Sequence, residues 1–511
     1  PALCVQAREG RLHVFLPYTT KLTDYLDLVS SIEDTCTYLE QPVWLEGYPP
    51  PSDPRLRSFS VTPDPGVIEI NLPPARNWDE LQSINELVFE QADATRLTAQ
   101  KFLYDGRQAT TGGGNHIVIG GPTAADSPVL RRPDLLRSML LFWQNHPSLS
   151  YLFSGAFVGP TSQHPRVDEA RMESLYELEI AFQQLPPKEC PPWLVDRLFR
   201  NLLVDMTGNT HRAEFCIDKL YPPQDAGLRL GLLELRAFEM APNLRMQLIE
   251  LLLIRALVAA FWKTPYIGSF IRWGTALHDR FFLPHFIKQD LLEVLAFLRQ
   301  SGYAFDPEWF AAQLEFRFPK IGSVALDGIQ LELRHGLEPW HVLGEEADST
   351  ATVRPVDFSL ERLQVKVSGW IESRHAAVCN HRRVPLYGTG APGEAVAGVR
   401  YRAWQPASCL HPTIPVHSPL VFDVVDLWNT NSLGGCFYHV MHPAGRPYTN
   451  RPSNADEAQN RRSERFQPFG DRPAPAFTAD EDTNSVYPMT LDLRRASAGE
   501  TTPATVNLPA P

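Results

Sequence analysis

Two segments of the sequence alternate apolar residues with acids and arginines, which is the spacing of a β-strand with one polar face. Residues 211–220 read HRAEFCIDKL and residues 231–240 read GLLELRAFEM. Since successive side chains of a strand point to opposite faces, each segment places its charged residues on one side. These residues are Arg212, Glu214, Cys216 and Asp218 in the first segment and Glu234 and Arg236 in the second. If the strands are neighbours, carboxylates and guanidinium groups meet on one face, where they could hold a metal ion and a phosphorylated ligand.

The same pattern also fits a solvated sheet surface. Cross-strand ion pairs on such a surface each contribute less than about 1 kcal/mol. The triplet Glu-x-Arg recurs at Glu315/Arg317 and at Glu332/Arg334. The triplet by itself therefore does not single out one copy as functional.

A glycine-rich segment, TGGGNHIVIGG at residues 111–121, ends its triple glycine directly before an Asn-His pair. Glycines let the backbone adopt positive φ and approach a ligand closely, and the exposed N–H groups of such turns favour anions. The residues expected to contact a bound anion are Gly112, Gly113, Gly114 and Asn115. His116 then enters an apolar strand, which would hold its ring beside the loop. A surface turn followed by a core histidine explains the segment equally well, and the Gly-Lys-Ser/Thr of a Walker loop is missing.

Two further acids stand in short strand-like segments nearer the start of the chain. Glu46 lies in VWLEGY and Glu69 in GVIEINL, where Glu69 and Asn71 share one face and the apolar residues share the other. Each is an ordinary surface carboxylate when considered alone. With His116 they form a set that suits a hard cation such as Mg²⁺, which takes carboxylate oxygens from separate elements together with water and substrate phosphates.

The composition indicates a globular chain of more than one domain and excludes several partners. With 511 residues, 43% of them apolar, the chain exceeds one ordinary core. The net charge is −12 and no block of basic residues occurs, so we expect no nucleic-acid partner. The longest apolar run, residues 248–262, contains Glu250 and Arg255 and is shorter than the roughly 20 residues of a membrane span. Seven scattered cysteines without a CxxC pair favour reduced thiols and a cytoplasmic location.

Apolar periodicity predicts an α+β fold. Helical spacing occurs at residues 25–39, 78–98, 169–183, 193–205, 243–262 and 288–300, and from Pro133 through LLRSMLLFWQN. Beyond residue 305 the spacing becomes that of strands, at residues 314–318, 330–335, 362–369, 396–404, 413–424 and 434–441. We therefore expect a catalytic domain over residues 1–305 and a mostly β domain over residues 306–450. Residues 451–511 lack apolar periodicity and are predicted to be a largely disordered tail.

The order of Glu46, Glu69, GGGNH and the Glu234/Arg236 pair resembles a bacterial family of amidoligases with a glutamine-synthetase-like fold. The resemblance rests on long runs, among them EGYPPPSDPRL at 46–56, TPDPGVIEIN at 62–71, HPSLSYLFSG at 146–155, TGNTHRAEFCIDKL at 207–220, LGLLELRAFEMAP at 230–242 and WGTALHDRFFLPHF at 273–286. In that family this region typically follows a transglutaminase-like domain, so we expect the chain to be part of a longer polypeptide. One departure is Thr110-Thr111 before the triple glycine, where the family pattern has Gly-Thr.

The resemblance implies a curved antiparallel sheet packed with helices, and an ATP-dependent reaction that uses Mg²⁺ or Mn²⁺. The residues implied to bind metal are Glu46, Glu69, Glu234 and His116, the last as a ligand or a phosphate contact. Arg212 and Arg236 would bind phosphate or the substrate carboxylate and would act in the reaction together with Glu234. The implied chemistry is transfer of the γ-phosphoryl group of ATP to a carboxylate, followed by attack of an amine on the acyl phosphate to give an amide. The two substrates would be small molecules or peptides.

Two other function classes are compatible with the sequence. The same sheet could transfer a phosphoryl group to a guanidino or other amine group, which a phosphorylated product in place of an amide would reveal. The protein could instead be a non-catalytic peptide-binding or scaffolding module, in which case Mg-ATP would not stabilise it against heat.

Overall fold

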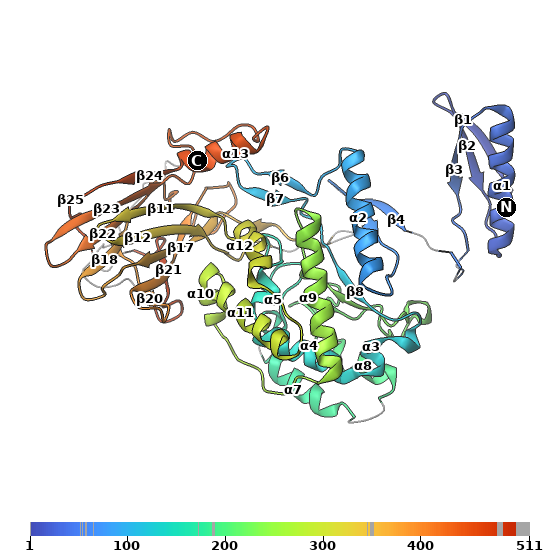
Figure 1. Ribbon diagram of the computed structural model, residues 1–511, viewed down its shortest axis with the longest axis horizontal. Coiled ribbons are helices and arrows are strands. Elements are labelled where there is room, and N and C mark those ends of the chain that lie inside the picture. The colour runs from blue at the N-terminus through green and yellow to red at the C-terminus, as the bar shows by residue number, and fades with distance from the viewer. Residues whose placement is uncertain are drawn as a thin grey trace, which may run out of the picture. The chain divides into compact units, whose positions relative to one another are not determined.

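A computed structural model describes residues 2–51, 53, 55–56, 59–64, 66–171, 173–186, 190–344, 346–347, 352–477 and 484–496. The protein is α+β, as the sequence predicts, with helices and mostly antiparallel strands (Figure 1). The chain forms two compact units, Pro1–Ile84 and Asn85–Pro511.

The first unit contains a β-α-β arrangement and a separate hairpin. Strand β1 (Cys4–Arg8) pairs antiparallel with β2 (Arg11–Leu16), and β2 pairs in parallel with β3 (Val43–Gly47). Helix α1 (Leu22–Leu39) makes the crossover that two parallel neighbours require. Val14, Leu16 and Leu22 are buried, so the apolar face of this sheet is the one against α1 (Figure 1). The hairpin consists of β4 (Ser60–Asp64) and β5 (Val67–Asn71).

Helices dominate the first part of the second unit. The longer ones are α4 (Pro133–Asn145), α7 (Ser174–Gln184), α8 (Pro192–Phe199), α9 (Leu244–Lys263) and α11 (Pro284–Gln300), while α2 (Trp78–Ala94) spans the boundary between the units. The short ones are η1 (Ala124–Asp126), α3 (Pro128–Arg131), α5 (Ser148–Tyr151), α6 (Val167–Ala170), η2 (Ala226–Leu228), α10 (Ala276–Phe281), η3 (Pro307–Phe310) and α12 (Ala311–Arg317). We call this part the helical region.

The core of the helical region is built around α4. Pro133 stands in its first turn, where its missing N–H costs nothing. The ring of Phe142 packs against Phe261 of α9 and Phe297 of α11, with centroid distances of 5.3 and 4.7 Å. Helix α9 begins at a cap in which the side chain of Asn243 accepts a hydrogen bond from the N–H of Met246. The apolar periodicity and the residues that begin these helices thus predict the same segments, and the long helices lie close to their predicted positions.

Short strands cross the helical region. Strands β6 (Gln100–Phe102) and β7 (Gln108–Thr110) form a hairpin. Strands β8 (Ile117–Ile119), β9 (Phe215–Cys216) and β10 (Leu233–Leu235) form an antiparallel sheet in the order β8-β10-β9. One face of this sheet is buried in the core through Ile117, Phe215, Leu233 and Leu235. The opposite face therefore carries the polar side chains.

From residue 320 onward strands outnumber helices among the elements that the structure describes, and we call this part the β-rich region. One sheet has the order β11-β12-β17-β21-β20 with β26 beside β21, and another has the order β19-β18-β22-β23-β24 with β25 beside β23. The strands of the first sheet are β11 (Lys320–Leu326), β12 (Ile329–His335), β17 (Leu360–Ser368), β20 (Tyr387–Gly388), β21 (Glu394–Arg402) and β26 (Thr490–Asp492). Those of the second are β18 (His375–Cys379), β19 (Arg382–Arg383), β22 (Leu420–Asp426), β23 (Asn431–Tyr438), β24 (Phe466–Phe469) and β25 (Arg472–Pro473). Two small ladders pair β13 (His341–Val342) with β16 (Val356–Asp357) and β14 (Glu346–Ala347) with β15 (Thr352–Val353).

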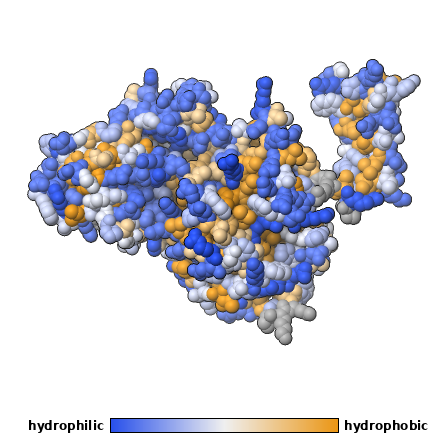
Figure 2. All heavy atoms as spheres, viewed as in Figure 1, coloured by the Kyte–Doolittle hydropathy of each residue, from blue (hydrophilic) through white to orange (hydrophobic). Residues whose placement is uncertain are grey.

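The two larger sheets share one apolar core. Its buried residues include Leu331, Val365 and Val399 from the first sheet and Phe422 and Cys436 from the second. Because the apolar residues lie between the sheets, the face of this region seen in Figure 2 is largely hydrophilic.

The prediction of a strand at residues 314–318 is wrong, because this segment belongs to helix α12 and the residues just after it. Phe310 and Gln313 are buried at the spacing of a helical face. A window of five residues is too short to distinguish a period of 2 from a period of 3.6.

The predicted disordered tail is also wrong for most of its length. Helix α13 (Ala455–Glu464) begins at Asn454, whose side chain accepts a hydrogen bond from the N–H of Glu457 at 2.8 Å. Strands β24, β25 and β26 each add to an existing sheet, and Leu491 is fully buried there. These segments are stabilised by the sheets they join, which their own periodicity does not reveal. Residues 497–511 of the predicted tail lie outside the described residues.

The predicted domain boundary near residue 305 differs from the division of the chain into units, which falls between Ile84 and Asn85. Within the second unit there are nevertheless two main apolar cores. The first draws mainly on residues 117–318 and the second on residues 326–493. None of the described helices combines the length and the apolar character needed to cross a membrane.

Candidate functional site

Strand β10 is the middle strand of the sheet β8-β10-β9 and contains the motif LELR. Both leucines of the motif are buried in the core, so Glu234 and Arg236 lie on the opposite face. Glu234 is the register partner of Cys216 on β9. The structure thus confirms that the two segments singled out in the sequence pair with each other.

The two strands are much shorter than expected, and the predicted alternation fails before β9. Ala213 and Glu214 are both buried, although alternation would expose one of them. The Oε1 atom of Glu214 accepts a hydrogen bond from Nε1 of Trp143 at 3.3 Å, so this acid points into the protein. Arg212 is half-buried in a turn outside any strand, where its N–H bonds to the carbonyl of Asn209 at 3.2 Å. The prediction that Arg212 and Glu214 belong to one regular polar strand face is therefore wrong.

The glycine segment is tied to the chain that follows β10. The N–H of Asn115 donates to the carbonyl of Phe238 at 2.8 Å, and the N–H of Met240 donates to the carbonyl of Gly113 at 3.1 Å. The loop therefore runs beside the end of the LELR strand, and the sheet holds it in place.

Two of the three glycines are required for different reasons. Gly112 has a φ of +87°, which confirms the predicted positive φ at this position. At Gly114 the reason is space, because an added Cβ would stand 2.8 Å from Cδ2 of His116. The imidazole thus rests directly on the glycine backbone.

His116, Glu234 and Arg236 form one connected group, which we call the HER group. Nδ1 of His116 lies 2.7 Å from Oε1 of Glu234, and Nη1 of Arg236 donates to the same oxygen at 2.7 Å. Burial alone would raise the pKa of Glu234, but the hydrogen bond from His116 and the charges of Arg236 and Lys219 lower it to about 2. The carboxylate is therefore ionised at neutral pH, as a metal ligand must be.

Two buried N–H donors at this site have no acceptor among the residues that the structure describes. They are Nδ2 of Asn115 and Nε of Arg236. A buried donor without a partner costs roughly 1–3 kcal/mol. An anion that accepts hydrogen bonds from both atoms would remove this cost, which fits a phosphate group beside the glycine segment.

Glu46 and Glu69 belong to the first compact unit. Oε1 of Glu46 on β3 lies 2.5 Å from Nδ1 of His13 on β2, a histidine that the sequence analysis missed. Glu69 is exposed on β5, opposite Thr62. The structure brings His116 and Glu234 together within the second unit, while the expected convergence of Glu46 and Glu69 with them stays a prediction.

The sequence analysis also missed a buried polar network in the helical region. Oε1 of Glu169 accepts a hydrogen bond from the hydroxyl of Tyr151 at 2.6 Å and lies 2.5 Å from Nε2 of His278. Burial lowers the pKa of nearby His164 to about 4, and the charge of His116 acts in the same direction. His164 is therefore close enough to both Glu169 and His116 for their charges to act on it. Tyr151 lies in the run at 146–155, His278 lies in the run at 273–286, and His164 and Glu169 lie between the two runs. No rule of sequence spacing connects residues so far apart.

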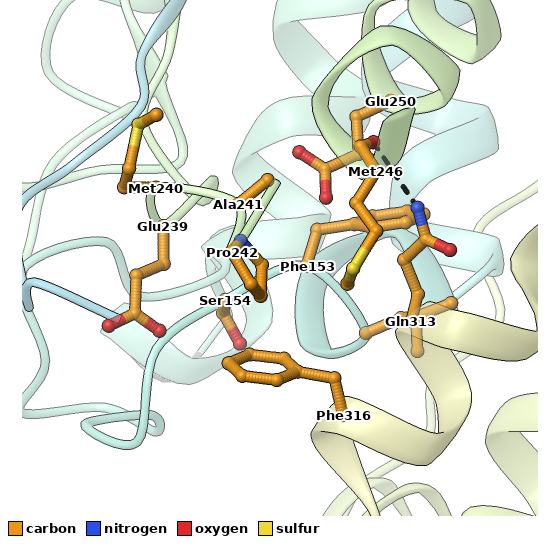
Figure 3. A pocket seen from close by; sticks show the side chains of 11 residues that line it. Phe153, Ser154, Glu239, Met240, Ala241, Pro242, Met246, Glu250, Gln313 and Phe316 are labelled. Atoms are coloured by element: carbon orange, nitrogen blue, oxygen red, sulfur yellow. Dashed lines mark hydrogen bonds between the residues drawn. The ribbon is translucent and has the colours of Figure 1, made fainter. Parts of the chain in front are cut away.

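A cavity of about 20 Å³ lies beside the chain that follows β10 (Figure 3). It is lined by Glu239 and Met240, by Met246 and Glu250 of α9 and by Gln313 of α12, among others. Oε2 of Glu250 and Oε1 of Gln313 are buried, and no donor from the described part of the chain reaches them. The cavity has room for about one water molecule and is far too small for a nucleotide. The nucleotide expected from the sequence therefore does not fit in this cavity.

Comparison with known proteins gives one match. A family model described as "Putative amidoligase enzyme (DUF2126)" matches residues 1–494. No curated protein matches the chain, and no solved structure does. Since the model covers nearly the whole chain, including the HER group, the match does not rest on one short motif. The chain belongs to this family.

Proposed function

We propose that the protein is an ATP-dependent carboxylate–amine ligase, which joins a carboxylate to an amine through an acyl phosphate. The observation that carries this proposal is the HER group beside the glycine segment. It combines an ionised carboxylate, an imidazole and an arginine with two N–H donors for which the described residues provide no acceptor. The fold-level part of the proposal is that β8, β10 and β9 belong to a curved, glutamine-synthetase-like antiparallel sheet.

The donor set fits a divalent cation. Glu234 is ionised and its oxygen lies next to a histidine nitrogen, so the pair offers the oxygen and nitrogen ligands of a Mg²⁺ or Mn²⁺ site. In the proposal Glu46 and Glu69 supply further carboxylates. A bound Mg²⁺ would neutralise charge on the phosphoryl group during its transfer.

The remaining residues of the site bind and orient the substrates. Nε of Arg236 and Nδ2 of Asn115 would donate to phosphate oxygens of ATP, and the backbone of Gly112–Gly114 would lie against the same group. Nη1 of Arg236 is held by Glu234, which fixes the guanidinium plane. Arg212 would bind the substrate carboxylate. Amine and carboxylate substrates are proposed to be small molecules or peptides, and a transglutaminase-like domain is the proposed upstream neighbour.

The test is release of ADP from Mg-ATP by the purified protein in the presence of pooled amino acids and peptides. Glu234→Gln should lower the rate by about 100-fold or more, because it removes the charge that a metal ligand supplies. Glu332→Gln is a matched control, since Glu332 stands in a second LELR motif on β12 and pairs with Arg334 at 2.9 Å. We expect Glu332→Gln to keep the wild-type rate.

Equal ADP release by Glu234→Gln and wild type would remove Glu234 from the mechanism. A phosphorylated product without an amide would replace the ligase by a phosphotransferase. If Mg-ATP neither reacts nor raises the melting temperature, the protein is a binding module.

A further inference from the structure

A second group of potential metal ligands lies next to the HER group, at strand β9. His211, Cys216 and Asp218 each direct one donor atom toward the others, and the three atoms lie within 4.8 Å of one another. Cys216 is the register partner of Glu234, so the thiol and this carboxylate belong to the same face of the sheet. His211 and Asp218 flank the strand on either side. A short strand between two turns thus brings together donors that are seven residues apart in the sequence.

The donor atoms of His211 and Asp218 are close enough to share one ion. Nδ1 of His211 lies 3.4 Å from Oδ2 of Asp218. The carboxylate of Asp218 also accepts side-chain hydrogen bonds from His211 and Cys216, so it already draws both potential ligands together. Two ligands that each lie about 2.1 Å from a tetrahedral zinc ion are about 3.4 Å apart.

The neighbours of Asp218 hold its carboxylate as the outer partners of a metal ligand do. Nη1 of Arg200 donates to Oδ1 of Asp218 at 3.1 Å, which leaves Oδ2 turned to His211. Nε of Arg200 also bonds to buried Asp196, at 2.9 Å to Oδ2. Because Asp196 neutralises Arg200, the arginine orients Asp218 without adding an unbalanced positive charge next to the ion.

The types of donor decide which ion would bind. A thiolate, an imidazole and a carboxylate together suit an ion of borderline softness, whereas Mg²⁺ and Ca²⁺ prefer oxygen ligands alone. Three protein ligands leave a fourth position of a tetrahedral ion open. The side chain of His211 is 59% exposed, so an ion can enter from solvent.

A Cys-His-Asp set could also form a nucleophilic site, but the surroundings of the cysteine argue against it. Cys216 is 2% exposed, so a substrate cannot reach it without rearrangement. Burial raises the pKa of its thiol to about 12, whereas an activated cysteine has a lowered pKa. A bound metal ion would reverse this, because a coordinated thiol loses its proton.

We propose that His211, Cys216 and Asp218 bind a divalent transition-metal ion, zinc in particular, beside the HER group. On binding, the thiol proton of Cys216 passes to solvent and the sulfur becomes a ligand. The two negative ligands then balance the charge of the ion. This site does not depend on the proposed ligase activity.

The test uses Co²⁺ as a spectroscopic substitute for zinc in the full chain, after metal has been removed with a chelator. We expect one Co²⁺ to bind with the near-ultraviolet charge-transfer absorption that a thiolate ligand produces, and added Zn²⁺ to displace it. Cys216→Ser should abolish this absorption. Cys436→Ser, which changes another buried cysteine in the core of the β-rich region, should leave it intact.

Two further variants make the result decisive. His211→Gln changes an exposed residue, so the protein should fold, and its affinity for Co²⁺ should fall more than about tenfold. Glu234→Gln should keep the absorption, which would separate this site from the HER group. The proposal is overturned if wild type shows no such absorption, if Cys216→Ser retains it, or if His211→Gln binds Co²⁺ as tightly as wild type. If Cys216→Ser does not fold, the affinity of His211→Gln for Co²⁺ decides whether the proposal holds.

Discussion

The neighbours of a motif distinguish one Glu-x-Arg triplet from the next. The pair Glu234/Arg236 lies against His116, and Nε of Arg236 finds no acceptor within the described ranges of the chain. In the second LELR motif, Glu332 is paired both with Arg334 and with Lys320, which makes an ordinary ion-pair network. The third triplet lies in helix α12, and its half-buried arginine, Arg317, donates a hydrogen bond to the carbonyl of Tyr151 at 2.9 Å. Recurrence in the sequence therefore does not imply a recurrent role.

The glycines of the TGGGNH segment allow a prediction at the residue scale. In Gly114→Ala the new methyl group would meet the ring of His116, whose side chain can turn away, so the protein should stay folded but lose the contact between His116 and Glu234. In Gly112→Ala the methyl group meets nothing within 4 Å, but φ is +87°, so the variant should lose about 1 kcal/mol of stability.

Two measurements separate these effects. Chemical unfolding should show the larger loss of stability in Gly112→Ala. The proton NMR signal of the imidazole N–H that is bonded to Glu234 should disappear in Gly114→Ala and persist in Gly112→Ala. An unchanged signal in Gly114→Ala would contradict the close packing of His116 on the glycine backbone.

At the scale of elements, long periodic segments were predictable and short ones were not. Helix α9 lies within one residue of its predicted ends, because twenty residues of apolar spacing and the cap at Asn243 agree. The sequence allowed the pairing of β9 with β10, whereas the proximity of Glu234 to His116 was expected only from the family resemblance. Their lengths were not, since the turn before β9 and the burial of Glu214 depend on packing against α4. The network around Glu169 joins segments that are distant in the sequence, so no periodic pattern predicts it.

Helix α9 carries a buried acid, Glu250, whose titration should be visible in stability. Burial and the charge of nearby Glu239 raise the pKa of Glu250 well above its usual 4.5. Above pH 4.5 the unfolded chain releases this proton while the folded chain keeps it, so the contribution of Glu250 to the free energy of unfolding falls as pH rises. Glu250→Gln removes this dependence. Its stability relative to wild type should therefore improve from about pH 5 to about pH 8.

Urea unfolding at several pH values checks this expectation. Glu177→Gln is the control, because Glu177 lies exposed in α7 and its replacement should change stability by the same small amount at every pH. A difference between Glu250→Gln and wild type that does not vary with pH would show that Glu250 is not held protonated by its surroundings.

At the scale of the whole second unit, one buried charge network joins the helical and β-rich regions. Glu338 lies 2.8 Å from Nε of Arg362 and 2.8 Å from Nε of Arg400. Arg362 also donates to the carbonyl of His278 at 2.7 Å, which reaches helix α10. Arg400 bonds to Asp492 at 3.3 Å, which reaches strand β26. The helical region, the first large sheet and the C-terminal segment thus meet at one carboxylate.

Glu338→Gln should therefore weaken the unit far more than a surface change of the same kind. The substitution removes the negative charge that Arg362 and Arg400 share, and both arginines are nearly inaccessible to solvent. It should therefore lower the free energy of unfolding by about 3–5 kcal/mol. Glu315→Gln is the matched control: Glu315 is 57% exposed and pairs with Arg334 at 2.6 Å, so its loss should cost less than about 1 kcal/mol. Chemical denaturation measures the loss of stability in both variants.

Because Glu338 links the two regions, its replacement should also make them unfold separately. Near-ultraviolet and far-ultraviolet circular dichroism should then report different unfolding midpoints for Glu338→Gln and coincident midpoints for wild type. Coincident midpoints and a loss no larger than that of Glu315→Gln would mean that the apolar contacts between the regions hold them together without this network.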